Sequence, residues 1–334
     1  MTYVDVPTNA YRRISLERFC ITTELISARH EFVFEGRSVT VQLPALHKEE
    51  LPFDQRRIDC YLWKSAGHIP VEYHVKSLDV EIELEAPTRV PEKILHLHPN
   101  QFEAFDSREQ QELNRIVSEM GNVASRAFEH WLRVLRWKSG VGHIGEPSVR
   151  YAATDGGGTV LRERATGHRF WLQGHTITSC GRRAVTLAGW ESTQIALNAN
   201  KVPPVWFDFL FDGEMRINNN DLVGAVLSLA IALEVNIRTL FSGELQKGTV
   251  EPVVLEIFDQ TNLRSLLNRI KKLRYWNKDW DDVTNLSTFN SLMNYRDRAM
   301  HSAETKNLDA MELRKMHAAV RRFAYFTCEF LGLS

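Results

Sequence analysis

The chain has 334 residues, enough for two or three domains that each bury a hydrophobic core. Hydrophobic residues make up 43% and charged residues 25%, a balance that excludes a disordered or fibrous chain. The formal net charge of -1 excludes a basic field over the whole surface, so nucleic acid would have to bind a local patch.

Residues 1–100 are predicted to be rich in β-structure. The segment EFVFEGRSVTVQLP, residues 31–44, contains two alternating runs on either side of a Glu-Gly pair, which is typical of a hairpin. In LDVEIELE, residues 78–85, apolar and acidic residues alternate. This pattern predicts a strand with one dry face and one acidic, wet face.

The hydrophobic period changes to that of a helix between Ser107 and about Lys138, and Gly121 is predicted to bend or split this helix. Its apolar stripe consists of Leu113, Ile116, Val117, Met120, Val123, Phe128, Trp131, Leu132 and Leu135. Residues 150–180 then indicate a small meander with turns at DGGG, residues 155–158, and at ATGH, residues 165–168.

KVPP at residues 201–204 is predicted to stop the preceding helix and to mark a domain boundary. Every segment after Pro204 is predicted to be helical. The segment 222–241 is apolar on nearly every face, as expected of the central helix of a bundle. The side chains of NNND, residues 218–221, are expected to cap it. Three further helical segments cover residues 262–276, 286–303 and 307–332.

The predicted fold class is therefore α+β, with a β-rich N-terminal domain followed by a C-terminal up-and-down helical bundle. We expect boundaries that divide the chain into residues 1–100, residues 101–203, with the long helix and the meander, and residues 204–334.

The four cysteines lie far apart with no metal-ligand spacing, which indicates thiols in a reducing compartment. The N-terminal residues contain no apolar signal-peptide core. The most apolar run, residues 222–233, spans 12 residues before Glu234 and is predicted to be too short to cross a bilayer. The expected location is the cytoplasm, without membrane contact.

The stretch NYRDRAMHSAE, residues 294–304, places basic, acidic and imidazole groups together near the end of the chain. On a helix, Asp297 lies beside His301, where a carboxylate favours the protonated imidazole, and Arg298 also borders His301. Arg296 lies about 140° around the helix from His301. Its planar guanidinium suits a bidentate grip on phosphate.

Two interpretations fit this spacing. These side chains could decorate an exposed helix face, which is common, or they could act on a phosphate. One undistorted helix does not easily aim both Arg296 and His301 at one phosphorus atom, whereas two helices facing each other across a two-fold axis do. The second interpretation therefore predicts a homodimer.

The sequence RDRAMH resembles the Arg-x4-His signature of the HEPN superfamily (higher eukaryotes and prokaryotes nucleotide-binding). The apolar segment 221–241, with its Ala-Leu-Glu, and the helix at residues 307–332 are also similar to parts of these helical bundles. The resemblance covers residues of about 204–334. No family is identified for the first 200 residues.

The resemblance implies a metal-independent, dimeric endoribonuclease with Arg296 and His301 as the catalytic pair and Asp297 as the polar residue that follows the arginine. The ribose 2′-OH would attack the adjacent phosphate, with His301 as general acid or base. Many bacterial members act as toxins or antiphage effectors, so a protein trigger, a phage-derived trigger or an antitoxin is an expected partner. No cofactor is expected.

A basic segment, residues 262–278, precedes the motif and contains six basic residues and no acid. The residues expected to bind single-stranded RNA there are Lys271, Lys272, Arg274 and Trp276, together with Arg298 from the motif. The alternative is a solvated helix face whose aromatic rings pack inward.

Other acidic and glycine-rich stretches have plainer interpretations. Glu234 could orient Arg296, although a pairing with Arg238 is favoured. DWDD at residues 279–282 is expected to form a turn or cap rather than a metal site. DGGG lacks the Gly-Lys-Ser/Thr of a phosphate loop, and His96 and His98 lack a third ligand.

These features leave two hypotheses for the whole chain. In the first, a HEPN-type ribonuclease is regulated by its N-terminal region. In the second, a non-catalytic bundle binds RNA or a nucleotide, or dimerises, while the N-terminal region recognises a ligand or a protein.

Overall fold

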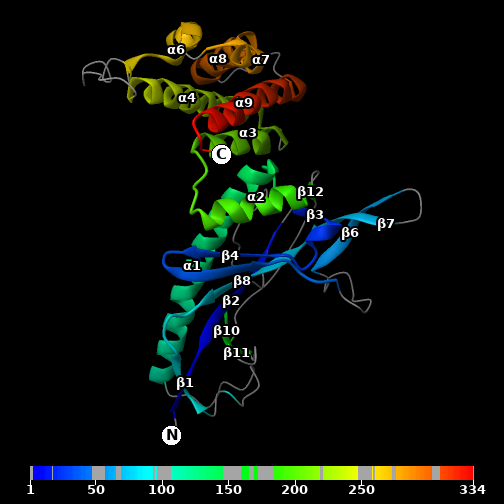
Figure 1. Cartoon of the computed structure of the whole chain (residues 1–334), viewed down its shortest axis with the longest axis vertical. Helices are drawn as coiled ribbons and strands as arrows, with labels where there is room; N and C mark the ends of the chain where they lie inside the picture. The colour runs from blue at the N-terminus through cyan, green and yellow to red at the C-terminus, as the bar shows by residue number, and fades with distance from the viewer. Residues whose placement is uncertain are drawn as a thin grey trace. The chain divides into compact units, whose positions relative to one another are not determined.

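The protein has an α+β fold, with strands in its N-terminal part and helices in its C-terminal part, as the computed structural model in Figure 1 shows. Two compact units follow each other along the chain, Met1–Val202 and Pro203–Ser334. The structure describes residues 3–16, 18–46, 57–64, 69–92, 95, 107–145, 159–164, 169–171, 184–218, 221–246, 258, 260–272, 276–302 and 309–333.

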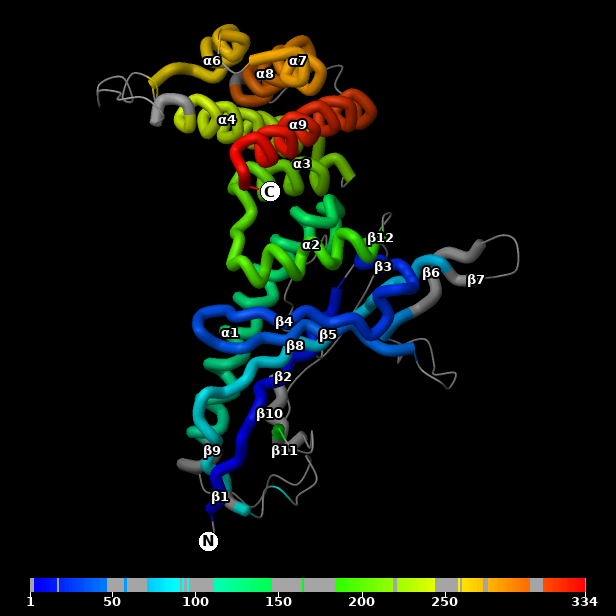
Figure 2. Tube along the Cα trace, viewed as in Figure 1, coloured from blue at the N-terminus to red at the C-terminus, as the bar shows by residue number. Residues whose placement is uncertain are grey.

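The largest sheet of the first unit has the strand order β11-β10-β2-β8-β5-β4, and all neighbouring strands are antiparallel. Its strands are β2 (Thr8–Ser15), β4 (Arg29–Phe34), β5 (Arg37–Gln42), β8 (Ser77–Glu83), β10 (Thr159–Glu163) and β11 (Arg169–Trp171). Figure 2 shows β10 beside β2, although about 150 residues separate them in the chain. The predicted meander thus extends the N-terminal sheet.

Two smaller sheets complete the strands of this unit. One has the order β12-β3-β7-β6, and the other pairs β1 with β9. Their strands are β1 (Tyr3–Val6), β3 (Cys20–Thr22), β6 (Ile58–Lys64), β7 (Ile69–Val75), β9 (Thr88–Pro91) and β12 (Ala184–Val185), and a 3-10 turn η1 (Thr23–Leu25) follows β3.

The predicted hairpin and the predicted two-faced strand are both confirmed. Strands β4 and β5 join at Glu35 and Gly36, with φ angles of 51° and 79°, as a tight two-residue turn requires. In β8, Leu78, Val80 and Ile82 are fully buried, while the acidic residues between them are partly exposed.

Helix α1 (Ser107–Ser139) packs against β2, β8 and β10 of the large sheet. The predicted split at Gly121 is wrong, because helix α1 is continuous through this residue, whose carbonyl accepts a hydrogen bond from Arg12 at 2.8 Å. The predicted separation of residues 1–100 from residues 101–203 is not seen either. The sheet and its covering helix share one core and form one unit.

The centre of this core contains a histidine from β4 between two tryptophans. Trp131 of α1 donates its indole N–H to Nδ1 of His30 at 2.8 Å. The ring of Trp190, from α2 (Leu187–Asn198), stacks on His30 with a centroid separation of 3.7 Å. Nε2 of His30 lies 3.0 Å from the carbonyl oxygen of Trp190.

The outer strand β4 is also held by a side chain of α2 that bonds to its backbone. The side-chain oxygen of Gln194 accepts from the N–H of Glu31 at 3.1 Å, and its amide nitrogen donates to the carbonyl of Glu31 at 2.7 Å. One glutamine therefore satisfies both outward backbone groups of Glu31, as a neighbouring strand would.

The described residues of the second unit form helices from α3 (Trp206–Asn218) to α9 (Ala310–Phe330). Between them lie α4 (Leu222–Gln246), α6 (Leu263–Arg269), the 3-10 turn η4 (Ile270–Lys272), α7 (Lys278–Val283) and α8 (Leu286–Ser302). Helix α4 packs against α3, α6, α8 and α9, which confirms its prediction as the central helix.

Within the described residues, one helix, α4, is long and apolar enough to cross a membrane by length and composition. The stretch, Leu222–Gly243, is longer than the 12-residue run expected, because the helix continues through Glu234. Half of the residues in the most apolar 18-residue stretch of this helix are buried inside the protein, as in the core helix of a bundle.

Helices α3 and α4 form a close hairpin. The carboxylate of Asp221 accepts from the N–H of Gly224 at 3.0 Å and caps α4, in agreement with the expected cap at residues 218–221. Gly213 of α3 lies directly against Leu229 of α4, where a Cβ atom would come within 2.7 Å of the leucine side chain.

Candidate functional site

The helix that contains the motif, α8, is defined by its cap and its buried stripe. The side chain of Asn285 accepts from the N–H of Thr288 at 3.1 Å and fixes the start of the helix. Phe289, Leu292 and Met293 are then fully or almost fully buried against the bundle. The helix continues without a break to Ser302 and thus includes Arg296 and His301.

Arg296 lies on the continuation of the buried stripe. Residues seven apart on a helix face the same way, so Arg296 follows Phe289 and Met300 follows Met293. Whereas Phe289 and Met293 are buried, the side chain of Arg296 is 35% exposed and Met300 is 62% exposed. The stripe therefore passes from the core to the surface at Arg296.

The guanidinium of Arg296 has one neighbouring acid among the described contacts. Its Nη1 lies 3.5 Å from Oδ1 of Asp297, which is long for a hydrogen bond. Nη2 of Arg264 on α6 lies 2.7 Å from Oδ2 of Asp297 and 3.2 Å from the side-chain oxygen of Asn294. The carboxylate of Asp297 is thus bound by Arg264 and lies near Arg296. Its predicted interaction with His301 stays a prediction, because the side chain of His301 lies outside the described residues.

His301 lies in the last turn of α8, and its side chain lies outside the described residues. Because α8 is an unbroken helix, the direction from its axis to His301 still differs by about 140° from the direction to Arg296. Within one chain, the helix therefore points the two predicted catalytic residues to different sides.

Arg298 lies on a third side of α8. Its guanidinium carbon is 6.0 Å from the ring centroid of Tyr295, and the hydroxyl of Tyr295 donates to Oε2 of Glu312 on α9 at 3.1 Å. Burial and, next, the hydrogen bond to Glu312 raise the pKa of Tyr295 above its usual value. This residue therefore stays a hydroxyl donor near neutral pH.

Two residues of the basic segment, residues 262–278, bind Asp281, which follows this segment in the chain. Nζ of Lys271 and the indole N–H of Trp276 both bind Oδ1 of Asp281, at 2.6 Å and 3.1 Å. The hydrogen bond from Lys271 lowers the pKa of Asp281. The ring of Trp276 stacks on Trp280 at 5.4 Å, Lys272 is exposed, and Arg274 lies outside the described residues.

These contacts favour the alternative for this segment, a solvated helix face whose aromatic rings pack inward, over an open surface on which RNA bases stack. Lys271 and Trp276 already have an intramolecular partner, so RNA would have to displace Asp281 to use both. Lys272 remains accessible at the surface.

DWDD and Glu234, the other candidate sites within the described residues, have roles in holding the fold. DWDD lies in the first turns of α7, which Asn277 caps, and Glu234 binds Arg238 at 2.8 Å, the favoured alternative. Among the described residues, no group of three or more His, Cys, Asp or Glu side chains could hold a metal ion. DGGG, His96 and His98 lie outside the described residues.

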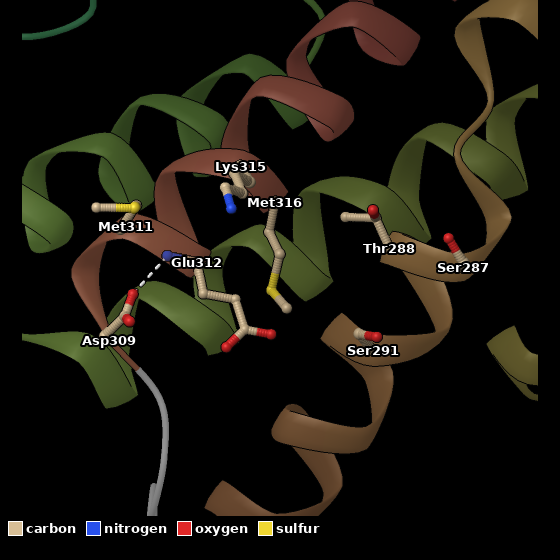
Figure 3. Close-up of a pocket in the computed structure, with 8 residues that line it drawn as sticks. All are labelled: Ser287, Thr288, Ser291, Asp309, Met311, Glu312, Lys315 and Met316. Carbon is tan, nitrogen blue, oxygen red and sulfur yellow. Dashed lines mark hydrogen bonds between the residues drawn. The ribbon is translucent and has the colours of Figure 1, made fainter.

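A surface pocket of about 370 Å³ lies between α8 and α9 (Figure 3). It is lined by Ser287, Thr288, Ser291, Asp309, Met311, Glu312, Lys315 and Met316. Asp309 is the N-cap of α9 and accepts from the N–H of Glu312 at 2.6 Å, so this carboxylate is already engaged. This pocket was not predicted from the sequence, although its three hydroxyl groups recur at helical spacing before the motif.

The structure thus brings Arg296, Asp297 and Arg264 together. It separates them from Arg298, which lies beside Tyr295 on another side of α8. Arg264 belongs to the basic segment, residues 262–278, but was not among the residues expected to bind RNA, and its ion pair with Asp297 joins residues 33 positions apart. Comparisons with models of protein families, with curated proteins and with solved structures found no match for this chain.

Proposed function

We propose that the unit Pro203–Ser334 is a HEPN-like bundle that acts as a metal-independent endoribonuclease. The observation that supports this proposal most is the position of Arg296. An arginine at the point where a core-facing stripe reaches the surface presents its guanidinium to solvent from a rigid, buried helix. Five residues later the same helix bears His301, as the HEPN signature requires.

In the proposed reaction the 2′-oxygen of a ribose forms a bond to the adjacent phosphorus while the bond from phosphorus to the 5′-oxygen breaks. The imidazole of His301 takes the proton of the 2′-OH and becomes an imidazolium. The leaving 5′-oxygen takes a proton from water, and the imidazolium gives its proton to the hydroxide that remains. A positioned general acid or base such as His301 contributes about 10²–10⁴-fold to the rate. Arg296 stabilises the negative charge that develops on the phosphate oxygens.

Asp297 has a positioning role in this proposal. Its carboxylate is anchored by Arg264 at 2.7 Å and lies 3.5 Å from the guanidinium of Arg296. A weak contact of this length holds the direction of Arg296 while leaving its N–H groups available for a phosphate. In this proposal Asp297 therefore supports Arg296.

The first unit, Met1–Val202, would regulate this activity by recognising a trigger, a phage-derived component or an antitoxin. In that case the protein acts in the cytoplasm as a toxin or antiphage effector that cleaves RNA when released from control. The resemblance of the motif to HEPN effectors is the support for this part of the proposal.

The experiment compares RNA cleavage by the wild-type protein, Arg296→Ala and His301→Ala, with mixed RNAs in the presence of EDTA. We expect cleavage by the wild-type protein and a loss of about 10²-fold or more in both variants. Arg322→Ala is the matched control, because Arg322 is an exposed arginine on α9 and its loss changes the net charge equally.

Growth arrest on expression, relieved by His301→Ala but not by Arg322→Ala, is the corresponding result in cells. Cleavage that is equal in all four proteins would assign the activity to another site or to a contaminant, and the proposal would be rejected.

A further inference from the structure

The pocket between α8 and α9 has the chemistry of a site for a flat, polar ring. Ser287, Thr288 and Ser291 place three hydroxyl groups on one side of α8 (Figure 3). Met311 and Met316 on α9 add polarizable thioethers, which make favourable contacts with aromatic rings. The volume of about 370 Å³ lies within the range of small-molecule sites.

The carboxylate of Glu312 is the group in the pocket that distinguishes one RNA base from another. Its Oε2 accepts from the hydroxyl of Tyr295 at 3.1 Å, which fixes the carboxylate in the pocket wall. A carboxylate has about four lone-pair sites, so it still accepts two further N–H donors side by side. Among the RNA bases, guanine alone presents two neighbouring donors, N1–H and the 2-amino group, on one edge.

The other bases fit this acceptor less well. Adenine and cytosine each present one amino donor beside a ring-nitrogen acceptor, and uracil presents one N–H between two carbonyl oxygens. Each would place an acceptor against the carboxylate, which is repulsive. The hydroxyl of Ser287 donates to Oδ1 of Asn285 at 2.8 Å and can still accept, whereas those of Thr288 and Ser291 donate or accept as needed. Together they complement the remaining polar atoms of a guanine.

The pocket also lies on the same side of α8 as a predicted phosphate-binding residue. Arg298 follows Ser291 by seven residues, so both face the same way and their positions are about 10 Å apart along the helix axis. Tyr295 lies between them, in contact with both Arg298 and Glu312. A base in the pocket would therefore have its backbone phosphates directed toward Arg298 and the last turn of α8.

We infer that the α8–α9 pocket binds a guanine base of the RNA strand and sets the position of cleavage relative to that base. The choice of an RNA base rests on the proposed ribonuclease function. Binding of the base itself is a property of the pocket and is measured separately.

The test uses guanosine 5′-monophosphate and the full chain with 13C-labelled methionine methyl groups. We expect the methyl resonances of Met311 and Met316 to shift on titration, and adenosine and uridine monophosphates to bind at least about tenfold more weakly. Glu312→Gln removes one acceptor and places a donor against the base, so it should weaken binding about tenfold or more. Glu329→Gln, an exposed glutamate elsewhere on α9, should not.

A second pair of variants fills the pocket without removing a charge. Ser291→Leu places a larger side chain in the pocket and should abolish the methyl shifts. Asn290→Leu makes a similar change at an exposed position next to it that does not line the pocket and should leave the shifts unchanged. Circular dichroism shows whether each variant retains its helices.

The outcomes separate this inference from the ribonuclease proposal. RNA cleavage without any shift of Met311 or Met316 on addition of the guanosine monophosphate overturns the guanine pocket and leaves the nuclease standing. Shifts that Glu312→Gln abolishes, in a protein that does not cleave RNA, support the pocket and reject the nuclease. Equal binding of the guanosine, adenosine and uridine monophosphates overturns the inference as well.

Discussion

At the scale of single residues, His30 is a histidine held in its neutral form. The indole nitrogen of Trp131 only donates, so Nδ1 of His30 must accept and Nε2 must carry the proton that is donated to the carbonyl of Trp190. A second proton would have no acceptor in this arrangement. Burial lowers the pKa of His30 to about 4, against the smaller opposing effect of the hydrogen bond to the carbonyl of Trp190.

This shift predicts that acid destabilises the first unit. Between pH 6.5 and about 4 the unfolded chain binds a proton at His30 and the folded chain does not, so stability rises with pH in this window. Acidification from pH 7 to pH 4 should therefore remove about 3 kcal/mol of the free energy of unfolding through this residue.

Urea unfolding of the wild-type protein and His30→Gln at pH 7 and pH 5 measures this contribution. The variant loses the imidazole ring, and with it Nδ1 as the placed acceptor for Trp131 and the stacking on Trp190, so it should be less stable at pH 7 by about 1–3 kcal/mol. The difference in free energy of unfolding between the two proteins should be smaller at pH 5. The wild-type protein loses stability there through protonation of His30 in the unfolded chain, the variant has no such group, and the other groups titrate alike in both proteins. A gap that stays constant with pH would contradict the assignment of a neutral His30.

At the scale of elements, the close hairpin of α3 and α4 depends on the absence of a side chain at Gly213. Leu229, which would meet a Cβ atom at 2.7 Å, is itself fully buried and cannot move into solvent. Such a contact separates the two helices or forces a strained rotamer. The hairpin in turn positions α4, against which α8 packs.

We predict that Gly213→Ala lowers the free energy of unfolding of the helical unit by about 1–3 kcal/mol. The matched control is Gly243→Ala, also within a helix, where a Cβ atom would lie at an ordinary contact distance of 3.6 Å from Leu331. This control should be neutral or stabilising by up to about 1 kcal/mol, because alanine favours a helix more than glycine does. Thermal unfolding followed by circular dichroism checks both, and similar effects would contradict the packing argument.

Patterns within a single element were predicted well from the sequence. The turn at Glu35 and Gly36, the alternation in β8 and the stripe of α1 depend on neighbouring residues alone. Contacts between distant segments were not predicted. The pairing of β10 with β2 and the ion pair of Arg264 with Asp297 join residues whose proximity is set by the tertiary fold.

The same distinction applies to the candidate site. The Arg296 and His301 positions follow from a local motif, and the helix that contains them was predicted. The pocket between α8 and α9 needs two helices in register, so the serine and threonine positions on α8 had no evident meaning before α9 was placed beside them.

At the scale of the whole molecule, the separation of Arg296 and His301 around α8 leads us to propose that residues of two chains act together in the proposed nuclease. The proposed active site is therefore shared by two subunits, with the arginine of one and the histidine of the other at each phosphate. A chain that lacks either residue still supplies the other to its partner.

Mixing Arg296→Ala with His301→Ala should therefore restore RNA cleavage that neither variant has alone. Random exchange of subunits yields half mixed dimers with one intact site each, which corresponds to about one quarter of the wild-type activity. Analytical ultracentrifugation of the mixture establishes the dimer. A monomer, or a mixed dimer without activity, would contradict the shared site.

Strand β4, at one edge of the large sheet, affects how the protein behaves in concentrated solution. An uncovered strand edge is a template on which a neighbouring molecule adds its own strand, and this is a common start of aggregation. Gln194 already occupies both outward main-chain groups of Glu31. Intermolecular strand addition along β4 would first have to break these two hydrogen bonds, so a single amide side chain protects this edge from self-association.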